Sequence, residues 1–142
     1  HMSNVTGEQF DIQSISQSIK EQTDAAIIAD GCQAYPHQQV DMDNLGIDAY
    51  AFSAHKHYGP NGVGITYLDA AHHDAYTPLI RGGGMVNSVS QTSYEQSTPP
   101  HGFEAGTLNA AGIVASAAGP LASPSDTIAT NDGAVQPAAA AA

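Results

Sequence analysis

The chain has 142 residues, enough for one domain with a sizeable core but too few for two. Its 14 acidic residues against 3 Lys and Arg residues give a formal net charge of −11, and so acidic a chain repels nucleic-acid phosphates and anionic membrane surfaces. A single cysteine allows no internal disulfide, no apolar run reaches the roughly 18 residues of a membrane span, and the first residues lack a signal-peptide pattern, so we expect a cytoplasmic protein with neither nucleic-acid nor membrane partners.

The first half of the chain alternates a helix with short apolar strands. Ile12, Ile15 and Ile19 fall at helical spacing and predict an amphipathic helix over residues 11–21. The run AAIIADG is short, branched and bounded by turn residues, which predicts a buried strand ending near Asp30. We expect a helical turn around DMDNLG and two further strands in DAYAFSAHK and GVGITYL, paired as a hairpin through the turn GPNG. This alternation predicts an α/β sheet covered on both faces.

The second half is expected to be less regular. The pattern of residues 69–76 predicts a short helix, and residues 81–102 predict a long loop rich in Gly, Ser, Thr and Pro, a length at which loops usually carry function. A helix of small residues is expected from Asn109 to its end at Gly119. Residues 120–142 show no apolar periodicity and end in five alanines, so we expect a low-complexity, disordered tail outside the domain.

Asp30 and Lys56 both fall at the end of a predicted strand, where α/β sheets bind their ligands. Such a pair allows three interpretations: an ion pair that stabilises the fold, a proton-transfer pair, or a Schiff-base lysine whose neighbouring carboxylate balances the charge of a cofactor. Ser53 and His55 alternate along the strand that ends at Lys56, so they share one face, and glycines follow. Hydroxyl, imidazole and amine groups beside flexible backbone favour a phosphate-binding seat.

Four blocks carry a family resemblance: DGCQAYPH, FSAHKHYGPNGVGITY, GGGM and FEAGTLN, in this order. They resemble the class V, pyridoxal-phosphate-dependent aminotransferases, and within these the SufS-like branch of cysteine desulfurases and selenocysteine lyases. The opening HMSNVTG also resembles the strand that precedes the family's aspartate. The resemblance covers residues 1–119 and implies part of the large domain of a fold-type I pyridoxal-phosphate enzyme, with a mainly parallel sheet and flanking helices.

The resemblance implies roles for individual residues. Lys56 resembles the lysine that forms the Schiff base, and Asp30 resembles the aspartate that pairs with the pyridinium nitrogen. Gln33 resembles the residue that bonds the phenolic oxygen of the cofactor. Ser53 and His55 resemble phosphate ligands.

Two further residues extend this implied site. Thr107, in FEAGT, resembles the threonine that reaches the phosphate of the partner subunit, and Asn4 resembles an asparagine near the cofactor ring. The resemblance therefore implies a homodimer. It also implies the removal of sulfur or selenium from cysteine or selenocysteine to give alanine, a sulfur-acceptor protein as partner, and a role in iron–sulfur cluster assembly.

The chain also departs from the family pattern. Ala54 replaces the usual glycine before the histidine, and the RGGGMV loop is one residue short. The family's ring-stacking residue, substrate arginine and sulfur-accepting cysteine have no counterpart here, so we expect the middle of a larger enzyme in which the final sulfur transfer cannot occur. Cys32 is interpreted as a small buried hydrophobic residue. Two alternatives stay open: another class V enzyme, such as an aminotransferase or epimerase, and a non-catalytic truncated α/β module.

The histidines do not predict a metal site. His55 and His57 lie two residues apart, and His72 and His73 are adjacent. A zinc site needs three or four converging ligands, and no Cys partner or HExxH spacing supplies them. We therefore interpret His72, His73 and His101 as surface or loop residues.

Overall fold

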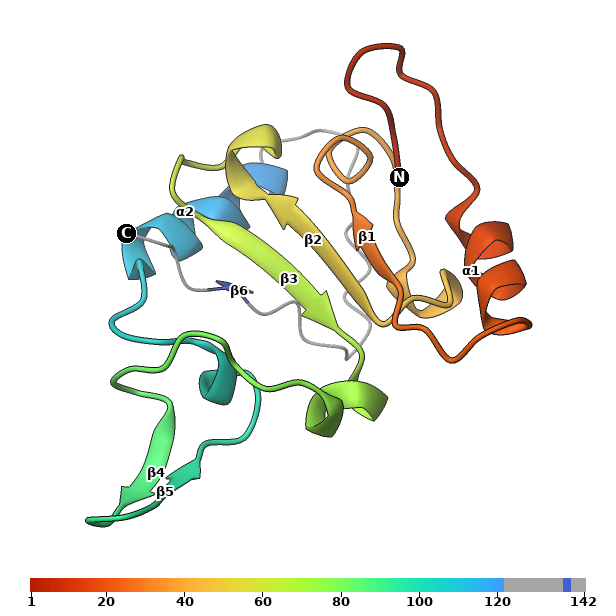
Figure 1. Cartoon of the computed structure of the whole chain (residues 1–142). Coiled ribbons are helices and arrows are strands. Elements are labelled where there is room, and N and C mark those ends of the chain that lie inside the picture. The colour runs from red at the N-terminus through yellow and green to blue at the C-terminus, as the bar shows by residue number, and fades with distance from the viewer. Residues whose placement is uncertain (122–136, 139–142) are drawn as a thin grey trace.

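The computed structural model describes residues 1–121 and 137–138. Its helices (α), 3-10 helices (η) and strands (β) follow one another as α1 (Ile12–Lys20), β1 (Ile28–Asp30), η1 (Met42–Asn44), β2 (Ala49–Ser53), η2 (Ala54–Lys56), β3 (Gly64–Leu68), η3 (Ala70–Ala75), β4 (Val86–Val89), β5 (Tyr94–Gln96), η4 (His101–Phe103), α2 (Ala110–Leu121) and β6 (Pro137–Ala138). Figure 1 shows a central sheet with a separate hairpin below it.

The described strands form a four-stranded sheet in the order β1-β2-β3-β6 and a two-stranded sheet of β4 and β5. β1 pairs with β2 in parallel, whereas β2 with β3 and β3 with β6 are antiparallel. The α/β class and the predicted hairpin of the second and third strands are thus confirmed. The described part of the sheet is mixed, with one parallel pairing, because the connection from β2 to β3, residues 54–63 with η2, is too short for the crossover that parallel strands need.

The hydrophobic core lies on one face of the sheet. Because side chains alternate along a strand, Ala29 of β1 and both Tyr50 and Phe52 of β2 point to this face. Partly buried side chains from α1, from the residue before β1, from the β1–β2 connection and from β3 pack against them: Ile12, Ile27, Cys32, Tyr35, Val40, Met42, Leu45, Ile65 and Tyr67. The ring of Tyr35 stacks on Phe52 with centroids 3.8 Å apart.

The opposite face, here called the outer face, carries Ile28, Asp30, Ala51 and Ser53. Ile28 is 66% exposed there. The prediction of a buried first strand is therefore wrong for this face, because β1 lies at an edge of the described sheet and only Ala29 is buried within it. The described residues thus cover the core face but leave the outer face of β1 accessible.

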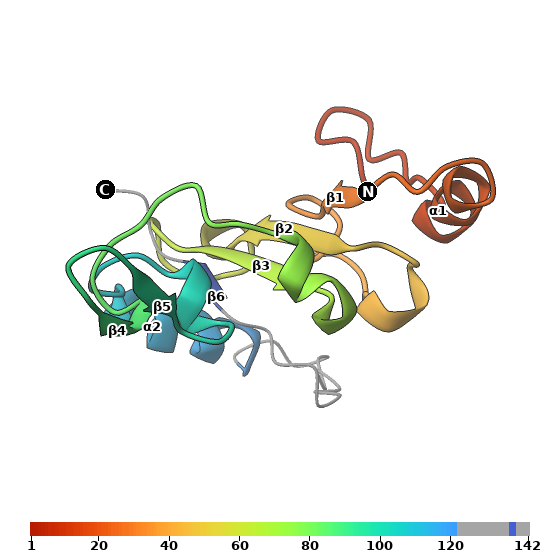
Figure 2. The same ribbon diagram turned by 60° about the horizontal axis from the view of Figure 1, so that its bottom comes forward.

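Two helices flank the sheet. α1 begins where the Asp11 carboxylate accepts a hydrogen bond from the Ser14 amide, and it lies beyond the β1 edge. α2 is capped by Asn109, which accepts from the Gly112 amide, and it lies against one face of the sheet (Figure 2). It ends at Leu121, two residues beyond the predicted end, a difference within the usual fraying of helix ends. Within the described residues, no helix has the length and apolar character to cross a membrane.

Residues 81–102 are not the single long loop predicted from sequence. They contain the β4–β5 hairpin, closed by a turn in which the Ser90 amide donates to the Ser93 carbonyl at 2.8 Å. Every residue of β4 is exposed, so no alternation of apolar and polar residues marks the strand in the sequence. The predicted disordered tail, residues 120–142, lies for the most part outside the described residues; Pro137–Ala138 pair with β3.

Candidate functional site

The parallel strands β1 and β2 end side by side, and their last residues face the same way. Asp30 ends β1 opposite Ala51, and Ser53 ends β2 two residues later, so Asp30 and Ser53 share the outer face. The 3-10 helix η2 follows at once and carries His55 and Lys56, both exposed. The predicted strand therefore ends at Ser53 rather than at Lys56, and the expectation that Ser53 and His55 share one strand face is wrong, because the chain turns into η2. The structure therefore brings four of the predicted site residues to one edge of the sheet.

Asp30 is held as an anion at this edge. Its Oδ1 accepts a hydrogen bond from the Cys32 amide at 2.8 Å. Bonds from the amide and the side chain of Cys32 lower the pKa of Asp30 most, the charges of the amino terminus and of Lys56 lower it further, and burial opposes them. Because Lys56 contributes, the two charges act on each other across the strand ends.

Gly31 fixes the backbone just after this aspartate. Its amide donates to the Ala51 carbonyl at 2.8 Å, which extends the β1–β2 pairing by one residue. A Cβ atom at Gly31 would overlap the ring of Tyr50. Tyr50 is fully buried, and its hydroxyl lies 2.8 Å from His1 Nδ1, so the ring has little room to move. Only glycine therefore permits this approach of the backbone to the ring.

The turn after β1 carries two residues singled out from sequence. Cys32 is half-buried rather than buried, and its Sγ lies 3.6 Å from Ser53 Oγ, because the turn folds back towards the end of β2. Gln33 is half-buried in the same turn, which the Tyr35 amide closes on the Gly31 carbonyl at 2.9 Å. This turn thus lies against the Asp30–Ser53 edge.

The turn that follows η2 packs against Tyr35 and against α2. The His57 ring lies edge-on to Tyr35, with centroids 4.9 Å apart, and Tyr58 adopts a left-handed backbone conformation with φ of 58°. A Cβ atom at Gly59 would come within 3.2 Å of the Ser116 backbone, so α2 lies directly against this turn. His57 and Tyr58 thus form part of the packed turn between η2 and β3.

Two predicted site residues lie elsewhere. Thr107 is exposed on the segment between η4 and α2, which lies across β3 from β1 (Figure 1). The Gly106 amide donates to the Gly83 carbonyl at 2.8 Å and ties this segment to the triple glycine. Asn4 is exposed in the amino-terminal loop, which starts next to the end of β1 and extends away from the sheet (Figure 1). The assigned roles of Thr107 and Asn4 stay predictions.

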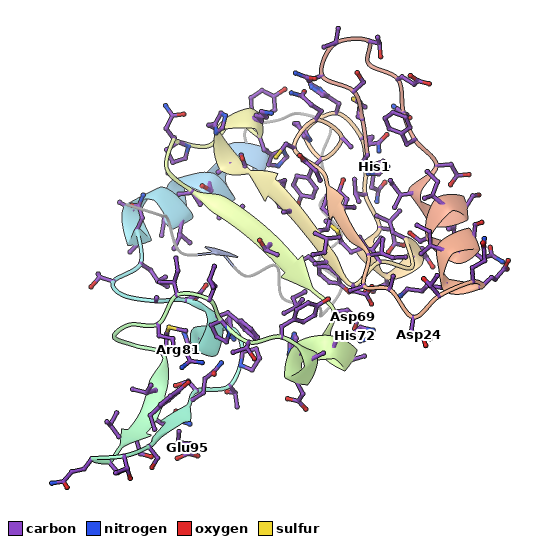
Figure 3. The ribbon with its side chains drawn as sticks, in the orientation of Figure 1. His1, Asp24, Asp69, His72, Arg81 and Glu95 are labelled. Atoms are coloured by element: carbon purple, nitrogen blue, oxygen red, sulfur yellow. The ribbon has the colours of Figure 1, made fainter. Side chains whose placement is uncertain are left out.

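Sequence reasoning missed a buried carboxylate at the opposite end of the sheet. Asp48, just before β2, is 3% exposed and accepts hydrogen bonds from Lys20 and from the Ile27 amide, while His72 Nε2 lies 3.0 Å from its Oδ1. Figure 3 places His72 beside Asp69, at the end of β3. His72 is a partly exposed residue, with 43% of its side chain accessible, and it also lies within bonding distance of the buried Asp48 carboxylate. The only sequence signal was an acidic residue opening an apolar strand.

Comparison with known proteins finds one matching family model and similar proteins of known name. The family model described as Aminotransferase class-V matches residues 1–120. A probable cysteine desulfurase of Xylella fastidiosa is 40% identical over 114 residues, which are 80% of this chain and 27% of that protein.

Two solved structures are also similar. The apo structure of the cysteine desulfurase of Thermococcus onnurineus matches with a TM-score of 0.79 and 34% identity, over 84% of this chain and 30% of that one. The cysteine desulfurase CsdA of Escherichia coli, solved in an S-sulfonic acid form, matches with a TM-score of 0.74 and 37% identity, over 83% and 29%. The chain thus spans between 27% and 30% of the length of these three proteins.

Proposed function

The chain belongs to the class V aminotransferase family, and from this premise we propose that its residues supply part of the pyridoxal 5'-phosphate site of a cysteine desulfurase. Members of the family depend on this cofactor, and the described α/β structure is part of the large domain of a fold-type I enzyme. One observation carries the proposal: Asp30 and Ser53 share the outer face at the ends of β1 and β2, and the exposed His55 and Lys56 follow directly in η2.

The chemistry of these side chains fits the cofactor. When bound, pyridoxal phosphate supplies an electron sink for the amino acid joined to it. The Asp30 carboxylate provides the negative charge that keeps a ring nitrogen protonated. Ser53 and His55 provide a hydroxyl and an imidazole for a phosphate, and the exposed Lys56 amine is accessible to an aldehyde.

Three residues have supporting roles in this proposal. Gln33 would bond the phenolic oxygen of the cofactor. Its position in the turn that packs against the Asp30–Ser53 edge supports this role. Asn4 lies near the ring. Thr107 binds the phosphate held by a second subunit, which is consistent with its segment lying across β3 from β1. The proposed assembly is therefore a homodimer.

The proposed substrate is cysteine or selenocysteine, and the proposed product is alanine. The names of the similar proteins support this class of reaction. Delivery of the sulfur to an acceptor protein, a part in iron–sulfur cluster assembly and a cytoplasmic location complete the proposal. The overall charge of −11 disfavours an anionic nucleic acid or lipid as acceptor.

Titration with pyridoxal phosphate, followed by visible absorbance, tests the cofactor site. We expect saturable binding that Lys56→Ala abolishes and that Asp30→Asn weakens at least tenfold, because the counter-charge is lost. Arg81→Ala is the matched control, since Arg81 lies over the Tyr94 ring in the hairpin region, and it should bind as the unmodified chain does. Equal binding by all variants would contradict the site.

The reaction class has its own test. Incubation of the protein with cysteine and pyridoxal phosphate should release alanine, because desulfuration keeps the amino group on the carbon skeleton. Release of a keto acid instead would favour an aminotransferase.

A further inference from the structure

We propose that Asp48 is a positioning residue: its buried carboxylate fixes the register of β1 against β2 and so places Asp30 relative to Lys56. The inference rests on the proposed function, because Asp30 and Lys56 are the proposed cofactor-binding pair. Asp48 itself lies at the other end of the strands and touches neither of them. Its effect on the site is therefore indirect.

The Asp48 side chain connects three elements. Its Oδ2 accepts from the Ile27 amide at 2.6 Å, immediately before β1. Its Oδ1 accepts from Lys20 Nζ, at the end of α1, at 3.3 Å and lies 3.0 Å from Nε2 of His72 in η3. Since the carboxylate is buried, these donors replace the water that an exposed carboxylate would bind.

The Asp48 backbone also bonds to Ile27 and to the residue that follows β3. Its amide donates to the Ile27 carbonyl at 2.9 Å, and its carbonyl accepts from the Asp69 amide at 3.0 Å. Asp48 is thus bonded to both polar groups of the Ile27 backbone on one side and to the end of β3 on the other. This fixes the chain one residue before the pairing of Ile28 with Ala49 begins.

The register of β1 depends on such a contact because few of its side chains are buried, so that bonds at its two ends, at Ile27 and at Gly31, hold the strand against β2. β1 has three residues, of which only Ala29 is buried, while Ile28 is 66% exposed. A shift of one residue would move Asp30 by about 3.3 Å along the strand and turn its side chain to the other face. Because the side chain would turn to the other face, Asp30 would leave the outer face that it shares with Ser53.

The electrostatics keep the carboxylate charged in this place. Burial by itself would raise the pKa of Asp48, but the Ile27 amide, Lys20 and His72 outweigh burial and lower it. A neutral side chain of the same shape would still fit the space. It would, however, lose the charge-assisted bonds that tie α1 and η3 to this point.

Hydrogen exchange of the full chain tests the proposal with Asp48→Asn and the control Asp43→Asn. Asp43 is an exposed carboxylate at the same end of the sheet, where it accepts from the Tyr67 hydroxyl. In Asp48→Asn we expect the amides of residues 28–31 to exchange at least tenfold faster, while those of α2 change less than twofold. Pyridoxal phosphate should bind at least fivefold more weakly, and borohydride reduction should still attach it to Lys56. The control should change neither readout.

His72→Gln is the second variant, for use if Asp48→Asn does not fold. It removes the imidazole but leaves the Ile27 contact, so we expect a threefold acceleration confined to residues 28–31. Unchanged exchange in these residues would overturn the proposal. An equal acceleration in β1 and α2 would also overturn it, because Asp48 would then act only on global stability. If the unmodified chain binds no cofactor, the proposed function fails, and the exchange pattern alone decides whether Asp48 sets the register.

Discussion

At each end of the central sheet the charge of a lysine acts on an aspartate, but the two aspartates are in opposite conditions. At one end Asp48 is buried and its oxygens are occupied by Lys20, His72 and the Ile27 amide. At the other end Asp30 is exposed beside Lys56, with one backbone bond to Oδ1. A carboxylate whose bonding capacity is used by its own chain can only stabilise or position. One that keeps free capacity on an accessible face can also bind a ligand.

The largest effect should come from Gly31→Ala at the Asp30 end. The new Cβ atom would overlap the buried Tyr50 ring, so we expect a loss of about 3 kcal/mol in the free energy of unfolding. Urea denaturation measures this loss. Gly83→Ala is the control, because a Cβ atom there meets nothing within 4 Å. Equal stability of the two variants would show that the Tyr50 ring moves aside for the new Cβ atom, which would contradict the expected overlap.

Asp48→Ala should be the next largest change. It leaves the Ile27 amide without its acceptor, which costs about 1–3 kcal/mol. Lys20 and His72 are partly exposed and can turn to solvent, so we expect a total loss of about 2 kcal/mol in urea denaturation. A loss below about 0.5 kcal/mol would contradict the difference between the two ends.

Low pH should destabilise the folded chain by protonating the Asp48 carboxylate. The pKa of Asp48 in the folded chain is lowered, so its stabilising contribution is complete above the unfolded value of 3.8 and is lost as the pH falls through the folded value. The free energy of unfolding should therefore fall more steeply between about pH 5 and pH 2 in the unmodified chain than in Asp48→Asn. Denaturation at several pH values checks this. Parallel curves would mean that Asp48 has the same pKa in both states.

Asp30→Asn should change stability least. The amide oxygen of Asn can still accept from the Cys32 amide, and the side chain is exposed, so we expect a change within about 0.5 kcal/mol. Cofactor binding should nevertheless weaken at least tenfold. A variant as destabilised as Asp48→Ala would show that Asp30 also has a structural role.

Apolar patterns predicted the elements that form the core. The spacing of Ile12, Ile15 and Ile19 predicted α1, and the apolar runs predicted β1, β2 and β3 and placed Asp30 at a strand end. The sequence did not predict η2, which places Lys56 three residues beyond the end of β2. The β4–β5 hairpin could not be predicted in this way, because its strands are exposed and carry no alternating pattern.

The environment of Asp48 also could not be read from the sequence. Its donors come from positions 20, 27 and 72, and only the folded chain brings them together. The same holds for Gly31, whose proximity to the Tyr50 ring depends on the parallel pairing of β1 with β2. Local sequence thus predicted which residues end the strands, whereas the contacts that hold those ends in place required the tertiary structure.

The most direct test uses the two lysines of the chain, one at each end of the sheet. The chain is incubated with pyridoxal phosphate and reduced with borohydride, and the modified lysine is identified by peptide mass spectrometry. We expect modification of Lys56, because Lys20 is engaged by Asp48, whereas Lys56 is exposed in η2. Equal modification of Lys20 and Lys56, or modification of Lys20 alone, would contradict the assignment of a structural end and a binding end.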